Sequence, residues 1–380
     1  MKIMIFNSLY YPYRVGGAEI SVQLLAEELV RIGHDVKVIT LHEKKSRHED
    51  LLNGVKVVYL PLKNIYWGFP NKTKSKIKKL IWHIRDCYNF GMKKQALAEL
   101  ESFKPDVVHT NNICGFSISV WDAVKKMDIK LVHTSRDYYL FHPNSTLFKN
   151  GKCMSPNDWS VKIWSLIKKY KSNKVDDYVG ISEYITDLHI ASGYFKKAER
   201  KVVYNSVDRK PSVSDVGCFK RIGFIGRLSI EKGFDVFCQL ASNYKNVEDI
   251  SFSAAGNFQN NNEGETLKLM AQKSSIKLLG YISLDSFLEQ VDVIILPLKW
   301  NEPFGRTVVE CAMAGKIVIT SPMGSMPELC DILPNVIVTT SMEDEFKEVI
   351  DGKIALTTTL LNTNMFSPNK IANQYLDIYK

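Results

Sequence analysis

Segments that would anchor or export a protein are missing from this 380-residue chain. No apolar run reaches the roughly 20 residues that a helix needs to cross a bilayer, so we expect any membrane contact to be peripheral. The apolar start of the chain, residues 2–6, is too short for a secretion signal. These absences predict a protein that works in the cytoplasm or at the inner face of the membrane.

Cysteine patterns that hold metals or form disulfide frameworks are also missing. The seven cysteines are scattered, their number is odd, and no Cys-x-x-Cys pair occurs. We therefore expect a reduced, intracellular protein without structural zinc. A Gly-x-Gly-x-x-Gly loop is absent as well, so the sequence does not indicate a dinucleotide site.

The composition of the chain is that of a globular protein. Hydrophobic residues make up 45% of the chain and charged residues 24%, and a chain of 380 residues is expected to form two domains. The net charge of +9 suits a nucleotide or an anionic lipid surface as a partner, and equally suits simple solubility. It also suits a nucleic acid, but no RNA-binding motif is visible, so we expect no nucleic-acid partner.

The order of elements predicts an α/β protein with two open, mostly parallel sheets. A strand at 2–6, a helix at 19–32 and a strand at 35–41 form a doubly wound start. The same alternation begins again with a strand at 221–226, and the polar stretch 209–220 between the two halves is typical of a connector.

These patterns define the predicted domains. We place the first domain at residues 1–208 and the second at 209–366. A last helix is expected at 367–380, with Ser367 as its N-cap and Pro368 at its first helical position.

A glycine pair precedes the first helix. Gly16 and Gly17 allow the backbone to approach a ligand closely, so we assign them to the donor-binding residues. The alternative is that the pair forms only a tight turn that opens the helix.

Polar side chains end two strands of the first predicted sheet. His109 and Asn111 follow one strand in the stretch PDVVHTNN, and Asp137 ends the next in IKLVHTSRD. In a doubly wound sheet the carboxyl ends of the strands line the ligand crevice, so these residues are candidates for the acceptor or sugar side. The alternative for a lone histidine in such a strand is a hydrogen-bonded core residue.

The stretch 291–327 reads as strand, turn, helix and strand. Its helix is expected to begin near Gly305, and the carboxylates Glu302 and Glu310 flank that start. The first amides of a helix attract anions, so the amides of Gly305 to Thr307 suit a phosphate, while the carboxylates suit sugar hydroxyls.

Two cations follow the first strand of the second domain. Arg227 and Lys232 lie in GRLSIEKG, directly after that strand, and are expected at the same sheet edge as the 291–327 stretch. Two cations and a helix start on one crevice suit a diphosphate.

The basic stretch 72–94 contains interleaved aromatic and aliphatic residues. This pattern is typical of a helix that lies on an anionic membrane surface. The alternative is a surface helix with a solvated basic face.

Taken together, the motifs resemble glycosyltransferase family four, whose members are retaining enzymes of the GT-B fold. The resemblance extends over nearly the whole chain and depends on six groups of residues. These are GGAE at 16–19, PDVVHTNN at 105–112, ISEY at 181–184 with VYNSVD at 203–208, GFIGRLSIEKG at 223–233, EPFGRTVVE at 302–310 and FSPNKIANQYLDIY at 366–379.

The resemblance implies two Rossmann-like domains facing a cleft, with the last helix crossing back to the first domain. It implies that Arg227 and Lys232 bind the diphosphate of a nucleotide-sugar, and that Glu310 takes the ribose hydroxyls. Glu302 would lie beside the donor sugar. The remaining donor-side residues implied by the motifs are Phe304, Gly305, Arg306 and Thr307, together with Tyr281 and Ile282 at the base. Catalysis is implied for Arg227, Lys232 and Glu302, with no metal ion and no cofactor.

The implied activity is transfer of a hexose, with retention, to a hydroxyl of a glycan or lipid-linked acceptor in the synthesis of a surface polysaccharide or lipopolysaccharide. A nucleotide-sugar epimerase of the same fold is the alternative. Two positions depart from the family pattern: Asn111 stands where a second histidine is common, and Ser325 follows Gly324 where a second glycine is common.

Overall fold

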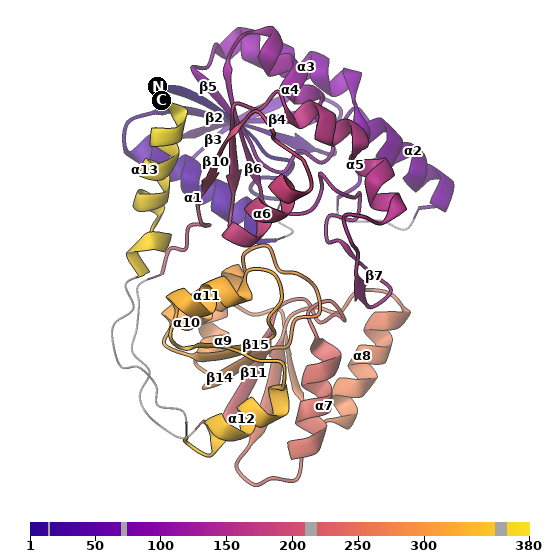
Figure 1. Ribbon diagram of the computed structural model, residues 1–380, viewed down its shortest axis with the longest axis vertical. Coiled ribbons are helices and arrows are strands. Elements are labelled where there is room, and N and C mark those ends of the chain that lie inside the picture. The colour runs from indigo at the N-terminus through magenta and orange to yellow at the C-terminus, as the bar shows by residue number, and fades with distance from the viewer. Residues whose placement is uncertain (14–15, 70–73, 210–218, 354–362) are drawn as a thin grey trace. The chain divides into compact units, whose positions relative to one another are not determined.

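The computed structural model describes residues 1–13, 16–69, 74–209, 219–353 and 363–380 (Figure 1). The chain forms two compact units. The first contains Met1–Leu147, Ser155–Asp208 and Met365–Lys380, and the second contains Phe148–Met154 and Arg209–Asn364. Each unit is a sheet flanked by helices, which confirms the predicted α/β class.

The first unit is built on an eight-stranded sheet with the order β10-β9-β6-β5-β1-β2-β4-β3. All neighbouring strands are parallel except β3 and β4. The strands are β1 (Lys2–Phe6), β2 (Asp35–His42), β3 (His48–Leu52), β4 (Val55–Pro61), β5 (Val107–Thr110), β6 (Lys130–Ser135), β9 (Asp177–Gly180) and β10 (Glu199–Val202). The helices are α1 (Gly17–Arg31), α2 (Lys76–Cys87), α3 (Phe90–Phe103), α4 (Ser119–Lys126), α5 (Trp159–Ser172), α6 (Glu183–Ala191) and α13 (Pro368–Tyr379).

The second unit is built on a six-stranded parallel sheet with the order β13-β12-β11-β14-β15-β16. Its strands are β11 (Arg221–Ile225), β12 (Ser251–Ala255), β13 (Lys277–Gly280), β14 (Val293–Leu296), β15 (Ile317–Thr320) and β16 (Val336–Val338). Its helices are α7 (Phe234–Tyr244), α8 (Asn262–Lys273), α9 (Leu284–Leu288), α10 (Arg306–Met313), α11 (Met326–Ile332) and α12 (Met342–Ile350). A short hairpin of β7 (Phe148–Lys149) and β8 (Lys152–Cys153) groups with this unit, although its sequence position lies inside the first.

One detail of the expected organisation differs from the structure, and another lies outside the described residues. The hairpin segment Phe148–Met154 departs from the predicted division at residue 208. Most of the predicted connector, residues 210–218, lies outside the described residues.

The basic stretch 72–94 was expected to be one helix, and this is wrong. The helix α2 ends at Cys87, Tyr88 is extended, and the Asn89 side chain accepts a hydrogen bond from the amide of Met92 (3.1 Å) to begin α3. An asparagine that caps a helix start interrupts a helical pattern, although the apolar spacing continues across it. Residues 72 and 73 lie outside the described part.

The last helix, α13, packs on the core of the first unit beside α1, as predicted. Ser367 caps it through a hydrogen bond from the amide of Lys370 (3.3 Å). Its buried face carries Ile371, Tyr375 and Tyr379, which complete the apolar cluster around β1 and β5.

A buried chain of hydrogen bonds joins α13 to the sheet. The Tyr379 hydroxyl lies 2.7 Å from Nδ1 of His109, Nε2 of His109 lies 2.7 Å from the Thr134 hydroxyl, and that hydroxyl lies 3.0 Å from the Tyr375 hydroxyl. Burial holds the pKa of His109 well below its usual value, so the ring is neutral and one nitrogen donates while the other accepts.

Replacement of Tyr379 by phenylalanine tests the contribution of these hydrogen bonds. Tyr379→Phe leaves a buried ring nitrogen of His109 without a partner, so we expect the free energy of unfolding to fall by about 1–3 kcal/mol in urea denaturation. The matched control on the same helix is Asp377→Asn, whose exposed pair with Lys380 should contribute less than about 0.5 kcal/mol. Equal stability of Tyr379→Phe and wild type would show that the chain of hydrogen bonds does not hold α13.

Candidate functional site

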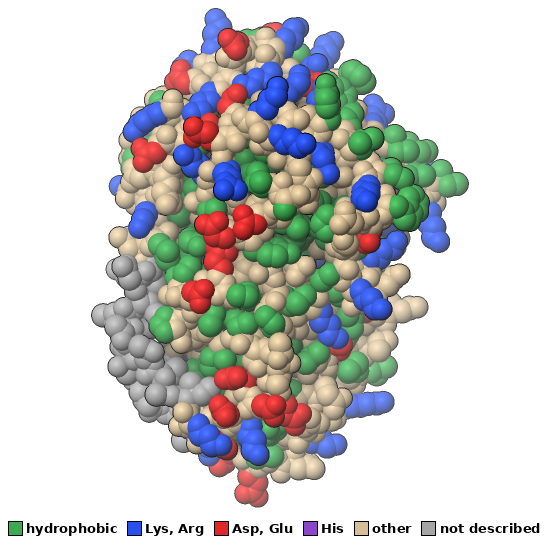
Figure 2. Space-filling view, viewed as in Figure 1, with side chains coloured by type: hydrophobic (Ala, Val, Ile, Leu, Met, Phe, Trp, Pro, Cys, Tyr) green, Lys and Arg blue, Asp and Glu red, His purple; other side chains and the backbone are tan. Residues whose placement is uncertain are grey.

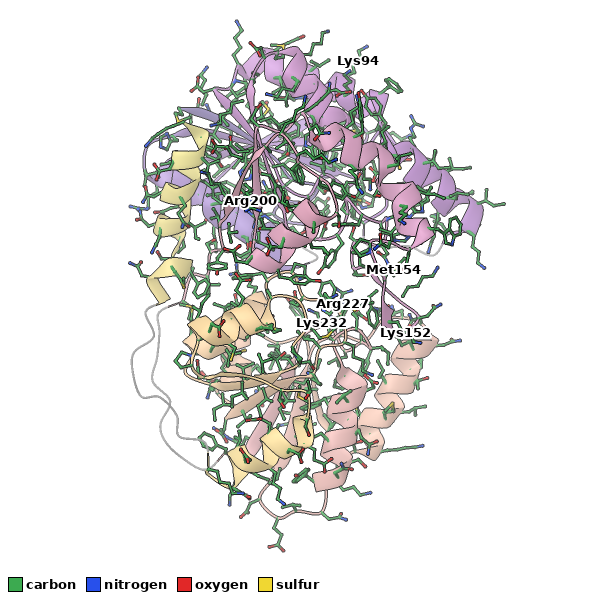
Figure 3. The ribbon with its side chains drawn as sticks, in the orientation of Figure 1. Lys94, Lys152, Met154, Arg200, Arg227 and Lys232 are labelled. Atoms are coloured by element: carbon green, nitrogen blue, oxygen red, sulfur yellow. The ribbon has the colours of Figure 1, made fainter. Side chains whose placement is uncertain are left out.

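The strand order brings two predicted segments to one point of the second sheet. The chain runs from β11 outward to β12 and β13, then returns to β14 on the other side of β11. The loops after β11 and β14 therefore open at the switch point, where ligands of open α/β sheets bind. The first loop carries Arg227 and Lys232 (Figure 3), and the second carries Glu302.

The loop after β11 leaves its backbone uncovered. Gly226 has a φ of 138°, and a Cβ added there would meet no atom within 4 Å. The neighbouring Gly256 must lack a side chain, because its Cβ would lie 1.8 Å from the carbonyl oxygen of Gly226. Two glycines thus keep the ends of β11 and β12 close together and leave room beside Arg227.

The ammonium of Lys232 forms an ion pair with the carboxylate of Glu302. Both side chains are largely buried, with exposed fractions of 22% and 15%. The Lys232 nitrogen also lies 4.8 Å from the centre of the Trp300 ring. A cation held against a carboxylate and an aromatic face has few other positions, so the lysine is well ordered before any ligand arrives.

Glu302 is held in turn by the segment that departs from the family pattern. The carbonyl oxygen of Glu302 accepts hydrogen bonds from the amide (2.9 Å) and the hydroxyl (3.2 Å) of Ser325. Gly324 has a φ of 66°, and a Cβ there would lie 2.2 Å from the same oxygen. The serine therefore supplies a contact to Glu302 that a second glycine could supply only in part.

The start of α10 has a glycine at its N-cap. Gly305 adopts the left-handed conformation at the N-cap, and a Cβ there would lie 2.4 Å from the end of the Met326 side chain. A glycine has no side chain to cap a helix, so the N-cap residue of α10 makes no side-chain hydrogen bond to the first turn. Phe304 is buried at this start, while Thr307 is half-buried in the first turn.

Glu310 lies one turn into α10 beside Arg306. The Nε of Arg306 donates to Oε1 of Glu310 at 2.8 Å. Burial raises the pKa of the Glu310 carboxyl, and the charge of Arg306 opposes that shift. One oxygen of the carboxylate remains for a second donor such as a hydroxyl group.

Tyr281 and Ile282 follow β13 at the same edge of the sheet, two strands from β11. Tyr281 is 84% exposed, which is unusual for a large aromatic side chain, and Ile282 is half-buried. Within the described part of the chain, no hydrogen bond, ion pair or ring contact joins either residue to Lys232 or Glu310, so their predicted role at the base stays a prediction.

Three residues of this site were not predicted from the sequence. Glu231 pairs with Arg227 at 3.4 Å, and the spacing of four residues could have indicated it. The Trp300 ring lies against the ammonium of Lys232. The charge of Arg209, which pairs with Asp285, opposes the rise that burial causes in the pKa of Glu310. Neither of these two contacts has a local sequence signal, because each joins segments far apart in the chain.

The glycine pair of the first unit lies at a helix start. The amide of Gly16 donates to the carboxylate of Glu19 at 2.8 Å, and α1 begins at Gly17. The pair thus opens the helix, and its predicted role in donor binding stays a prediction. Residues 14 and 15, which precede the pair, lie outside the described residues.

His109 is part of the core rather than of an open surface. Both of its ring nitrogens are engaged by Tyr379 and Thr134, which is the alternative that the sequence left open. Neither ring nitrogen is available to an acceptor, which argues against the predicted acceptor-side role of His109. Its sequence signal, a histidine at a strand end, was the same as that of a ligand-binding histidine.

Asn111 and Asp137 lie at the carboxyl ends of their strands. The side-chain oxygen of Asn111 accepts from Nε of Arg136 at 2.8 Å, and the guanidinium also bonds to Asn205. Asp137 is half-buried and accepts from the amide of Tyr139 at 2.8 Å, and burial raises the pKa of its carboxyl to about 6. Arg136 and Asn205 were not predicted, and they give Asn111 a hydrogen-bonding role.

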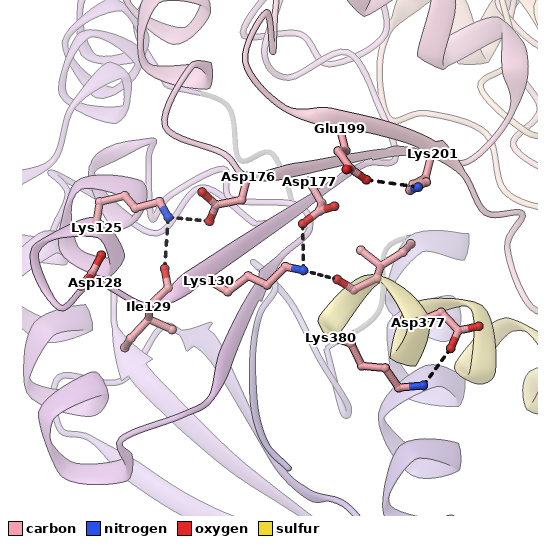
Figure 4. Close-up of a pocket in the computed structure, with 11 residues that line it drawn as sticks. Lys125, Asp128, Ile129, Lys130, Asp176, Asp177, Glu199, Lys201, Asp377 and Lys380 are labelled. Carbon is pink, nitrogen blue, oxygen red and sulfur yellow. Dashed lines mark hydrogen bonds and ion pairs between the residues drawn. The ribbon is translucent and has the colours of Figure 1, made fainter.

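A depression in the first unit lies at the opposite edge of its sheet (Figure 4). It is lined by the amino ends of β6, β9 and β10 and by the end of α13. Its charges neutralise one another in the pairs Lys130–Asp177, Lys125–Asp176, Lys201–Glu199 and Lys380–Asp377. Because parallel strands present their ligand sites at the carboxyl ends, this depression is not the acceptor site.

Among the described residues, no group of three or more His, Cys, Asp or Glu side chains is arranged to hold a metal ion. The expectation that no metal takes part is not tested by that observation and stays a prediction.

Known families match both halves of the chain. The family described as Glycosyltransferase Family 4 matches residues 15–210, and the one described as Glycosyl transferases group 1 matches residues 215–352. An uncharacterised 42.6 kDa protein in the cps region of Klebsiella pneumoniae is 46% identical over 386 residues, which cover 100% of both chains.

More distant proteins are similar in sequence or in structure. The phosphatidylinositol N-acetylglucosaminyltransferase GPI3 subunit of Saccharomyces cerevisiae is 24% identical over 362 residues, covering 88% of this chain and 70% of its own. The structure of Anabaena Alr3699/HepE in complex with UDP superposes with a TM-score of 0.71 at 17% identity, covering 100% of this chain and 99% of the other. These similarities confirm the predicted GT-B architecture.

The two family matches span nearly the whole chain, and they agree with a switch-point site that combines cations, carboxylates and a helix start with a glycine N-cap. The chain therefore belongs to glycosyltransferase family 4 and is a glycosyltransferase.

Proposed function

We propose that this protein transfers a sugar, with retention of anomeric configuration, from a nucleotide-sugar to a hydroxyl of a glycan or lipid-linked acceptor. The observation that carries the proposal is the contact between Lys232 and Glu302 at the switch point of the second sheet. The product would be a cell-surface polysaccharide, made in the cytoplasm at the inner face of the membrane.

The contact matches the chemistry of a nucleotide-sugar. In such a donor one oxygen atom separates the sugar from the diphosphate, so a group that binds the phosphate and a group that binds the sugar must be neighbours. Lys232 suits the phosphate and Glu302 suits the sugar hydroxyls. Arg227, whose side chain is 52% exposed, provides a second cation on the same loop.

The other end of the donor suits the start of α10. The amides from Phe304 to Thr307 donate to the diphosphate, and Glu310 accepts from the ribose hydroxyls. The base would lie toward Tyr281, whose exposed ring offers a flat apolar face.

The chemistry proposed for this site is a front-face displacement. The bond between the anomeric carbon and the leaving oxygen breaks, and the acceptor oxygen bonds to that carbon on the same face. The acceptor proton moves to an oxygen of the leaving diphosphate, so no protein base is needed. Lys232, Arg227 and the α10 amides stabilise the charge on the diphosphate, and we propose that no metal ion is required.

Similar proteins support the donor and acceptor classes. Anabaena Alr3699/HepE is known in complex with UDP and with UDP-glucose, which supports a nucleotide-sugar. The yeast GPI3 subunit is a phosphatidylinositol N-acetylglucosaminyltransferase, which supports a lipid-linked acceptor. The cps-region relative from Klebsiella supports a role in surface polysaccharide synthesis.

Lys232→Ala tests the charge contact. Loss of a cation that stabilises the leaving diphosphate should lower turnover by about a hundredfold or more, measured as release of nucleoside diphosphate with a membrane lipid extract as acceptor. The control is Lys220→Ala, an exposed lysine at the amino end of β11 that pairs with Asp249. Near-normal turnover in Lys232→Ala would remove the lysine from the reaction.

The donor class is tested by thermal stabilisation with UDP-, GDP- and ADP-sugars. We expect one nucleotide class to raise the melting temperature, because a ligand of the native state adds stability. Glu310→Ala should weaken the binding of that class about tenfold or more, since the ribose loses a charged acceptor. The control Glu265→Ala removes an exposed carboxylate of α8 and should bind like wild type. An absence of stabilisation by all three classes would contradict the donor assignment.

The stereochemistry separates transfer from the epimerase alternative. We expect NMR spectra of the product to show the anomeric configuration of the donor, and incubation of the donor without acceptor to yield no epimer. An inverted product would exclude the front-face displacement. An epimer formed from donor alone would favour the epimerase.

A further inference from the structure

The helix α5 presents its apolar residues to solvent. Its buried residues are Val161, Ser165, Lys168 and Ser172, of which only the first is apolar. The opposite face is exposed and carries Trp159 (75%), Ile163 (61%), Leu166 (73%), Ile167 (37%) and Tyr170 (73%). An amphipathic helix of a globular protein normally buries its apolar face, whereas α5 exposes it.

The neighbouring helix α2 has the same character. Ile77, Leu80, Ile81 and Ile84 recur at the spacing of one helical face, and all four are exposed. The two helices contact each other, and the ring of His83 lies 6.1 Å from that of Trp164. Figure 2 shows hydrophobic side chains gathered over this region of the molecule, with lysine and arginine side chains among them.

Buried polar contacts fix both helices in this orientation. The ammonium of Lys168 donates to the carbonyl oxygen of Tyr139 at 2.6 Å, and the Tyr139 hydroxyl donates to the carbonyl oxygen of Asp86 at 3.1 Å. The Asp86 carboxylate accepts from the amide of Gly115 at 2.6 Å. Rotation of either helix to bury its apolar face would break these bonds and leave a charge unpaired, which is costly.

The charges around the apolar face have one sign. The acidic residue in α2 is Asp86, which is buried, and α5 contains no acidic residue. Lys76, Lys78 and Arg85 of α2 and Lys162 of α5 are exposed and form no ion pair with any described residue. The apolar face is therefore surrounded by cations that are available to bind anions.

We propose that α2 and α5 together form a docking surface for an anionic lipid bilayer, named here the α2–α5 face. The exposed isoleucines and leucines enter the boundary between headgroups and acyl chains, Trp159 and Tyr170 lie at the headgroup level, and the cations contact anionic headgroups. No described helix is long and apolar enough to cross a membrane.

Charge complementarity favours a bilayer over a protein as the occupant. A bilayer is apolar in its interior and negative at its surface, which matches an apolar stripe flanked by cations on both helices. A second copy of this face would bring like charges together, which opposes self-association. The proposal does not depend on the donor chemistry, because binding is measured without nucleotide.

Co-sedimentation of the full chain with vesicles tests the proposal. Vesicles of phosphatidylcholine alone are compared with vesicles that contain about one third phosphatidylglycerol. We expect partitioning onto the anionic vesicles to be about tenfold stronger or more, and to weaken as salt is raised.

Two double variants separate the apolar and ionic contributions. Ile163→Gln with Leu166→Gln should weaken binding to anionic vesicles about tenfold or more, because two exposed side chains no longer enter the bilayer. Lys76→Glu with Lys78→Glu should abolish the preference for anionic lipid. The matched controls are Leu269→Gln on α8, which replaces a side chain that is 57% exposed, and Lys277→Glu on β13. Both controls should bind like wild type.

Three outcomes would overturn the proposal. The first is that wild type fails to sediment with anionic vesicles. The second is that the Gln double variant keeps its melting temperature and still binds like wild type. The third is that wild type is a dimer in sedimentation velocity and the Gln double variant is a monomer. The last outcome would assign the α2–α5 face to a second copy of the chain. Transferase activity is assayed separately on a soluble acceptor analogue, so its loss would bear on the proposed function alone.

Discussion

The pairing of β11 with both β12 and β14 is the constraint on which the candidate site depends. All strands of this sheet are parallel, so after each strand the chain must return to the same edge of the sheet before the next strand begins. The strand order runs to one side of β11 with β12 and β13 and to the other side with β14, so the loops after β11 and β14 are adjacent and no crossing helix lies between them. The loop of Arg227 and Lys232 is far in sequence from that of Glu302. The change of side in the strand order at β11 brings the two loops together.

The ion pair of Lys232 and Glu302 then organises the site before any donor binds. Two opposite charges in contact neutralise each other, so neither has the desolvation cost of an isolated buried ion. In the function proposed above, a diphosphate bound to Lys232 would replace Glu302 as the partner of the ammonium group, and Glu302 would then be available to sugar hydroxyl groups. The supporting residues are of two kinds: glycines that let backbones approach, at 226, 256, 305 and 324, and the side chains of Trp300 and Ser325 that limit movement.

Much of this arrangement was readable from the sequence. The strand and helix alternation, the capped last helix and the segments that carry Lys232 and Glu302 depend on local patterns of polarity, glycine and proline, and they were predicted. The contacts of Trp300 with Lys232 and of Arg136 with Asn111 join distant segments, so no local pattern indicates them. His109 was misassigned for a related reason. A histidine at a strand end has the same sequence pattern whether its ring bonds to Tyr379 or to a ligand. The exposure of α5 was also missed, since apolar spacing shows that a helix has two faces but does not show which one is buried.

The return of α13 to the first unit has a consequence for the order in which the protein can fold during synthesis. Residues 365–380 leave the ribosome after the whole second unit, yet Tyr375 and Tyr379 fill the core around β1 and β5. Until they arrive, the nascent first unit presents an apolar groove, and Nδ1 of His109 lacks its partner Tyr379. The second unit, whose described segments from Arg209 to Asn364 form one nearly continuous stretch, can complete its sheet earlier. The half of the molecule that is made first is thus finished last, and nascent-chain chaperones would find their binding surface on it.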